Sequence, residues 1–156
     1  MIVAIASFPG TETKKLCKTL AMRLGLKHLS REIVDAKAIA ASSESSRQEI
    51  AEEESKGNFI TDSMIACKQL QKAVKIFLHS ARKARAKQVS EREKISMGAA
   101  LEKIEEEEKA LSKAIAAISG TGYFVPEEFD MVLNLDRLDE EATIALVEKF
   151  LEKIKK

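Results

Sequence analysis

The residue types nearest to phosphate chemistry lie in the first turn of the chain, around Pro9 and Gly10. An apolar, β-branched run from Ile2 to Ala6 precedes this turn, and leucines spaced four apart follow it. This pattern predicts a strand, a tight turn and a helix in that order. Backbone N–H groups at such a helix start can bind phosphate, because the helix dipole favours negative charge there. The candidate phosphate- and nucleotide-binding residues are therefore Gly10, Thr11, Thr13, Lys14 and Lys15.

The turn lacks the chemistry of a working phosphate loop, which reads G-x-x-x-x-G-K-[ST]. In one register Glu12 stands at the second glycine, Thr13 at the lysine and Lys14 at the magnesium-binding hydroxyl. Shifting the register by one residue places Lys14 at the lysine but Lys15 at the hydroxyl. The carboxylate of Glu12 would also repel a phosphate. We therefore expect a turn that resembles a phosphate loop in shape but not in chemistry.

Strand and helix patterns alternate along the whole chain. Short apolar runs predict strands at 2–6, 26–29, 58–61, 73–78 and 131–135. Helices are expected up to Gly25, over 31–41, 62–70 and 80–93, from Ser96 to Gly120, and over 140–154. The polar stretch 42–57 is expected to be a mobile helical arm. This alternation indicates a single α/β domain over residues 1–156, with a parallel sheet and helices on both of its faces.

Composition excludes several classes of function. The net charge is +1, so the bulk charge indicates neither an acidic nor a basic partner. No apolar run is long enough for a signal peptide or a membrane span, so no membrane association is expected. Cys17 and Cys67 have no metal-ligand spacing and are expected to be reduced core thiols of a cytoplasmic protein. His28 and His79 have no partner at ligand spacing, so we predict no metal site.

Two longer segments carry a family resemblance. KIFLHSARKARAKQVSEREKIS (75–96) and AALEKIEEEEKALSKAIAAISGTGYFVPEEFDMVLNL (99–135), with Arg31 to Ile33, resemble the archaeal-type cytidylate kinases. These are P-loop nucleoside monophosphate kinases. The resemblance implies a three-layer α/β fold with a five-stranded parallel sheet in the order 2-3-1-4-5. It also implies an arm on the monophosphate side over 31–57 and a helical lid over 94–122.

The functional positions of this family are largely replaced here. The family has an acidic-Gly-Arg triplet after its third strand, and the matching residues of this chain are Asp62, Ser63 and Met64. The positions of the lid arginines hold Glu107, Ser112 and Ala114. The resemblance leaves four candidates, namely Arg31 and Asp62 on the monophosphate side and Arg85 and Lys87 on the lid side.

Phosphoryl transfer depends on positioning and on the cancellation of charge, and one arginine can be worth about 10³–10⁵ in rate. The replaced residues lie in the loop, after the third strand and in the lid. All of these replacements lower the expected rate of phosphoryl transfer. The sequence therefore favours a degenerate, non-catalytic family member that serves as a binding or scaffold module, for which the residues indicate no particular cofactor. Two alternatives remain: an active CMP kinase that uses ATP and Mg²⁺ with Lys14 or Lys15 on the phosphates, and a nucleotide sensor without catalysis.

The segment from residue 68 to 94 has a marked excess of positive charge, with Glu91 and Glu93 as its only acids. Such a segment can contact a phosphate backbone. It lacks the series of aromatic residues that base stacking needs, so sequence-specific reading is not expected. We predict structured RNA or a ribonucleoprotein as the partner, contacted through Lys68, Lys72, Lys75, Arg82, Lys83, Arg92 and Lys94.

Plainer roles are expected for several of these residues. Thr11 and Thr13 can cap the first helix, and Asp62 can be the N-cap of the helix that follows it. The acidic run from Glu105 to Glu108 is expected to be a solvated helix face.

Overall fold

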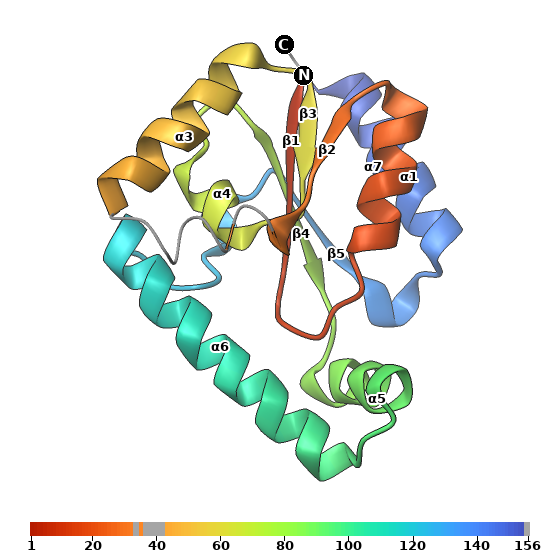
Figure 1. Cartoon of the computed structure of the whole chain (residues 1–156). Helices are drawn as coiled ribbons and strands as arrows, with labels where there is room; N and C mark the ends of the chain where they lie inside the picture. The colour runs from red at the N-terminus through yellow and green to blue at the C-terminus, as the bar shows by residue number, and fades with distance from the viewer. Residues whose placement is uncertain (33–34, 36–42, 155–156) are drawn as a thin grey trace.

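The computed structural model describes residues 1–32, 35 and 43–154. Its strands form one parallel sheet in the order β2-β3-β1-β4-β5, which is the order that the family resemblance implies (Figure 1). The strands are β1 (Ile2–Ser7), β2 (Lys27–Leu29), β3 (Phe59–Thr61), β4 (Val74–His79) and β5 (Met131–Asn134). Helices cover both faces of this sheet, so the expected three-layer α/β fold is confirmed.

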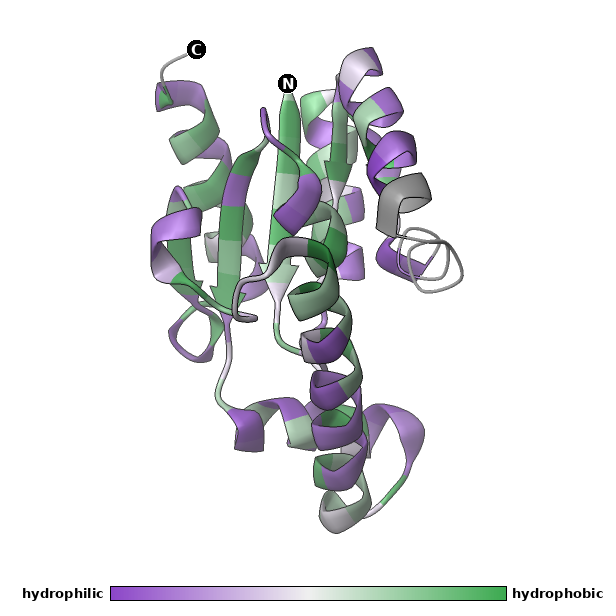
Figure 2. Ribbon diagram, turned by 90° about the vertical axis from the view of Figure 1, so that its left-hand side faces the viewer, coloured by the Kyte–Doolittle hydropathy of each residue, from purple (hydrophilic) through white to green (hydrophobic). Residues whose placement is uncertain are grey.

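The central strand, β1, is buried along its whole length. Its side chains alternate, so that Val3 and Ile5 enter one hydrophobic cluster while Ala4 and Ala6 enter the other. The first cluster includes residues of α1 (Lys14–Leu24) and α7 (Glu140–Lys153). The second includes residues of α3 (Ser43–Lys56), α4 (Met64–Gln69) and α6 (Met97–Ser119). Figure 2 shows hydrophobic residues concentrated along the strands and hydrophilic stretches along the helices.

A helical arm, formed by α5 (Arg82–Glu93) and the first half of α6, extends beyond the carboxyl edge of the sheet (Figure 1). It has a small core of its own, made of Ala86, Val89, Ala100 and Ile104. The second half of α6 contributes Ile115 and Ile118 to the main core. Because both halves of α6 are anchored by buried residues, this helix connects the arm rigidly to the sheet.

Local signals set several helix ends where the sequence predicts them. Gly25 and Gly120 end α1 and α6 in the left-handed conformation, with φ of 66° and 68°. Ser96 caps α6 by accepting a hydrogen bond from the Ala99 N–H. Three expected caps are wrong. Ser63, not Asp62, caps α4. The side chains of Thr11 and Thr13 make no capping bond, although Thr13 stands at the N-cap of α1.

The remaining connections are short. Two 3₁₀ turns flank β5, at Pro126–Glu128 and Leu135–Arg137. The polar stretch that we expected to be a helical arm forms α3, and Ile50 on that helix packs into the core. Most of the helix expected over 31–41 lies outside the described residues. Within the described part of the chain, none of the helices has the combination of length and apolarity needed to cross a membrane.

Candidate functional site

The candidate site lies where the parallel strands end. The turn Phe8–Thr13 follows β1, Asp62 follows β3, and Ser80 follows β4. Because all three strands run in the same direction, these residues meet at one edge of the sheet, which is where α/β folds place their ligands. We call this turn, together with Asp62, Arg85 and Glu108, the strand-end site.

Gly10 is required by the packing of the turn. Its φ of +88° lies in the left-handed region, and the Thr11 N–H donates to the Phe8 carbonyl at 3.3 Å. A Cβ atom added to Gly10 would lie 3.0 Å from the Ile104 side chain and 3.2 Å from Cβ of Arg85. The glycine therefore allows α5 and α6 to approach the turn closely, a structural role that needs no phosphate.

Arg85 is the central side chain of the site. It is only 4% exposed, and its Nε donates to the Ser80 carbonyl at 3.0 Å. Its Nη1 donates to the Pro9 carbonyl at 2.8 Å and to the Glu108 carboxylate at 2.7 Å. The guanidinium also lies 5.0 Å from the centre of the Phe8 ring. Arg85 is thus bound inward, with its charge neutralised by a carboxylate of α6.

Glu108 does not belong to a solvated face, and this expectation is corrected. The neighbouring residues of the run, 105–107, are exposed, whereas Glu108 is partly buried. Its second carboxylate oxygen accepts a hydrogen bond from Arg82 at 2.8 Å. Two cations of α5 therefore share one carboxylate of α6, and this bridge holds the arm against the turn.

An aromatic cluster lies behind the turn. The rings of Phe8 and Tyr123 stack with centroids 5.1 Å apart, and Phe77 contacts Phe8 edge-on at 5.2 Å. The Tyr123 hydroxyl donates to the Ser7 carbonyl at 2.8 Å. Burial raises the pKa of Tyr123 well above its usual range, so the hydroxyl remains a donor. Sequence reasoning missed both Phe8 and Tyr123, because neither belongs to a motif.

The phosphate-side candidates lie together at the start of α1, as predicted, but both lysines are engaged. Lys14 pairs with Glu32 at 2.9 Å and Lys15 pairs with Glu140 at 3.2 Å. The hydrogen bond from Lys14 lowers the pKa of the Glu32 carboxyl. Both pairs are exposed, so a ligand could displace them at little cost.

One polar group in the turn has no partner. The Oγ1 atom of Thr11 is buried and makes no hydrogen bond within the described part of the chain. A buried hydroxyl of this kind costs about 1–3 kcal/mol unless a water or a ligand oxygen bonds to it. Thr11 is therefore the position in the turn most open to a further contact.

The monophosphate side is organised around Asp62, which is 4% exposed. Its Oδ1 accepts hydrogen bonds from the Arg31 N–H at 2.8 Å and from Nε2 of His28 at 3.3 Å. The neighbouring Ser63 hydroxyl donates to Asp35 at 2.6 Å, and burial raises the pKa of Asp35 to about 6. Asp62 thus anchors the chain after β2, and His28 has a partner that its sequence position does not reveal.

The basic residues of 68–94 lie in two groups, one at each end of β4. Lys72 precedes that strand and α5 follows it, which separates the groups by roughly 17–20 Å. Several of them are already bonded: Lys68 pairs with Glu128 and Arg92 pairs with Glu12. Among the basic residues of 68–94, all of which the structure describes, the side chains without an ion pair or hydrogen bond are those of Lys72, Lys75, Lys83, Lys87 and Lys94.

The residues present do not fit a kinase magnesium site. Lys14 or Lys15 replaces the hydroxyl ligand, and the Oδ1 atom of Asp62 is occupied by two donors. Among the described residues, His, Cys, Asp and Glu nowhere form a group of three or more that could hold a metal ion. The Arg85 guanidinium is bonded to the Pro9 carbonyl and to Glu108.

The sheet order and the turn after β1 define the class: the chain has the α/β fold of the P-loop kinases. The solved structures that it resembles share that fold at low identity. An uncharacterised protein from Eubacterium ventriosum matches with a TM-score of 0.85 and 18% identity, over 99% of both chains. Shikimate kinase from Bacteroides thetaiotaomicron matches with a TM-score of 0.62 and 13% identity, over 97% of this chain and 98% of that one. TT1252 from Thermus thermophilus matches with a TM-score of 0.57 and 15% identity, over 99% and 98%.

A comparison of sequences points to one family within this class. Residues 62–137 match the sequence model of the cytidylate kinase-like family, and the chain is cytidylate kinase-like over this stretch. The resemblance to the cytidylate kinase-like family is thereby confirmed over residues 62–137. Among curated proteins, none matches the chain.

Proposed function

We propose that this protein is a non-catalytic member of the cytidylate kinase-like family that acts in the cytoplasm as a binding or scaffold module. The observation that carries the proposal is the position of Arg85. An arginine that stabilises a transferring phosphoryl group must face the ligand with its charge free. This one is buried, and its Nη1 donates to Pro9 and Glu108.

The residues of the turn and of the lid positions also support a non-catalytic function. The turn has no lysine and hydroxyl in a working register, and the lid positions hold Glu107 and Ala114 in place of arginines. Each such arginine can be worth about 10³–10⁵ in rate, so their combined loss leaves little catalysis. The buried contacts of Arg85, Phe8 and Tyr123 use the same elements to stabilise the fold instead.

The proposal is tested by turnover of CMP with ATP and Mg²⁺, beside an authentic cytidylate kinase. We expect a rate at least about 10³-fold below the 1–100 s⁻¹ of ordinary kinases. Circular dichroism of the same sample shows whether the protein is folded. A rate within the ordinary range from folded protein would refute the proposal.

The alternative of an active CMP kinase is favoured by one observation, the unpartnered hydroxyl of Thr11 next to Lys14 and Lys15. In that case a phosphate would replace Glu32 and Glu140 as partner of the two lysines. Lys14→Ala and Lys15→Ala would then abolish turnover without unfolding the protein. A nucleotide sensor would instead bind ATP with an affinity that hardly depends on Mg²⁺, because the magnesium-binding hydroxyl is missing.

A further inference from the structure

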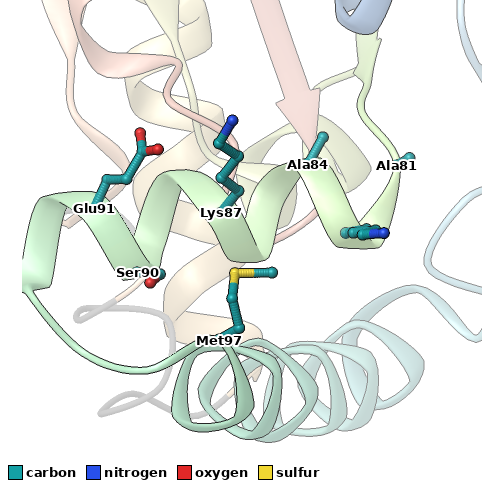
Figure 3. Close-up of a pocket in the computed structure, with 7 residues that line it drawn as sticks. Ala81, Ala84, Lys87, Ser90, Glu91 and Met97 are labelled. Carbon is teal, nitrogen blue, oxygen red and sulfur yellow. The ribbon is translucent and has the colours of Figure 1, made fainter.

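A surface groove lies along the helical arm, away from the strand-end site. Its volume is about 670 Å³. Its lining comes from the start of α6, from α5 and from the residue before α5: Ala81, Lys83, Ala84, Lys87, Ser90, Glu91 and Met97. We call it the α5–α6 groove. Figure 3 shows Met97 extending from α6 toward α5, and Lys87 and Glu91 leaving α5 on the same side, one turn apart.

The positively charged side chains of α5 fall into two sets, those that are paired and those that are not. Arg82 and Arg85 are paired with Glu108, and Arg92 is paired with Glu12. Lys83 and Lys87 are both exposed, line the groove, and make no ion pair with any described residue. Being four residues apart, they lie on one face of the helix. The groove therefore presents two free cations one helical turn apart.

The groove lining also has apolar residues. These are Ala81 and Ala84 beside the lysines and Met97 of α6, which is 37% exposed. Leu101, one turn further along α6, is also 37% exposed. Apolar surface between charged residues on a helix pair is typical of a helix-binding groove.

We propose that the α5–α6 groove binds an acidic amphipathic helix of a partner protein. Apolar side chains of that helix pack on Ala84 and Met97, and two acidic side chains four residues apart pair with Lys83 and Lys87. This proposal rests on the proposed function, since it names the partner class of the binding module.

The same features argue against other occupants. Five of the seven lining residues are exposed, so the groove is too open to enclose a small molecule, whose surface is usually 70–90% buried. Neither α5 nor α6 carries an aromatic residue on which a nucleic-acid base could stack. Glu91 lies in the groove and would repel a phosphate backbone, whereas a peptide can place a basic residue beside it.

The size of the groove sets the expected strength of binding. A helix laid along α5, which has 12 residues, contacts about 18 Å of it. Interfaces of this size belong to the small, transient class, for which dissociation constants near micromolar are expected. Rim charges are screened by salt, so the affinity should fall as ionic strength rises.

The test uses the full chain and three labelled probes. The first is a helical peptide of about 14 residues with leucines on one face and glutamates four apart beside them. The second has lysines in place of the glutamates, and the third is an RNA hairpin. Binding is measured by fluorescence anisotropy. Amide chemical shifts of ¹⁵N-labelled protein then locate the bound peptide without any variant.

Two double variants, matched in charge, complete the experiment. Lys83→Glu with Lys87→Glu reverses the groove lysines. Lys149→Glu with Lys153→Glu reverses two exposed lysines, also four apart, on α7. We expect the acidic peptide to bind near residues 81–97, to lose at least tenfold in affinity in the groove variant, and to change less than twofold in the control.

Several outcomes would overturn the inference. They are the absence of saturable binding by the acidic peptide, equal binding of the lysine peptide, preferential binding of the RNA, and chemical shifts centred outside the α5–α6 groove. None of these depends on turnover of CMP. The experiment therefore distinguishes failure of the helix-binding proposal from failure of the non-catalytic proposal.

Discussion

The guanidinium of Arg85 donates to the carboxylate of Glu108 at 2.7 Å, across the interface between the helices α5 and α6. The two side chains are 5% and 17% exposed. They join two positions 23 residues apart in the chain, in two separate helices. Together with three further hydrogen bonds, this ion pair holds α5, α6 and the turn after β1 together.

Arg85→Met should destabilise the protein strongly. Removal of the guanidinium leaves the Ser80 and Pro9 carbonyls without this donor and leaves Glu108 with only the exposed Arg82 as a partner, which costs about 3–5 kcal/mol. Arg82→Met is the matched control, because Arg82 pairs with the same carboxylate but is 56% exposed. For this variant we expect a loss of no more than about 1 kcal/mol. The measurement is urea unfolding followed by circular dichroism, and equal losses in the two variants would contradict the assigned role of Arg85.

Gly10→Ala should cost more free energy of unfolding than Gly25→Ala. Both glycines have positive φ, for which an L-residue costs about 1–2 kcal/mol. Space is open around Gly25, but at Gly10 a methyl group would lie 3.0 Å from Ile104. Thermal or urea unfolding of the two variants measures the difference. Equal costs would show that α5 and α6 do not press against the turn.

Asp35→Asn should stabilise the protein at neutral pH but not in acid. Burial raises the pKa of Asp35 from its ordinary 3.8 to about 6, against the effects of the Ser63 hydroxyl and Arg31, while the nearby Asp62 raises it further. The folded state then holds this proton more tightly than the unfolded state does. The contribution of Asp35 to stability is therefore fully favourable below about pH 4 and is lost as the pH rises to about 6.

The size of this effect follows from the same values. A shift of about 2 units corresponds to roughly 2–3 kcal/mol. Urea unfolding at pH 4 and pH 7.5 should show the gain of the asparagine variant only at the higher pH, since asparagine keeps an acceptor for Ser63. Glu106→Gln, an exposed position on α6, is the control and should show no such change. An equal gain in stability at both pH values would contradict the raised pKa of Asp35.

The two thiols should be inert in the native protein. Cys17 is 0% and Cys67 1% exposed, and both are free. Burial raises the pKa of both, that of Cys67 to about 12, so the reactive thiolate is scarce at pH 8. A colourimetric thiol reagent should titrate both only after denaturation. Fast reaction of either in the folded state would show that its part of the core opens readily.

Local sequence patterns were sufficient for most elements and for several of their ends. The apolar run of β1, the helix-ending Gly120 and the capping Ser96 act through neighbouring residues, so a single sequence predicts them. Alternation of strands and helices predicted a parallel sheet, but the strand order came from the family resemblance. The predicted thiol state of Cys17 and Cys67 is likewise confirmed.

The strand-end site depended on contacts between distant residues, which sequence patterns do not show. Asp62 was expected to cap α4, yet the adjacent Ser63 does so and Asp62 bonds to His28, 34 residues away. Glu108 did leave a signal, because it interrupts the apolar stripe of α6 between Ile104 and Leu111. A charged residue on a buried stripe indicates a buried partner, but only the fold identifies Arg85 as that partner.

The most direct test of the central claim is calorimetric titration of the protein with ATP, with and without Mg²⁺ and CMP. We predict no saturable binding up to millimolar ATP and no effect of Mg²⁺, because Arg85 is committed to Pro9 and Glu108 and the metal-binding hydroxyl is missing. Binding in the roughly micromolar range that is strengthened by Mg²⁺ and by CMP would contradict the account and establish a working kinase site.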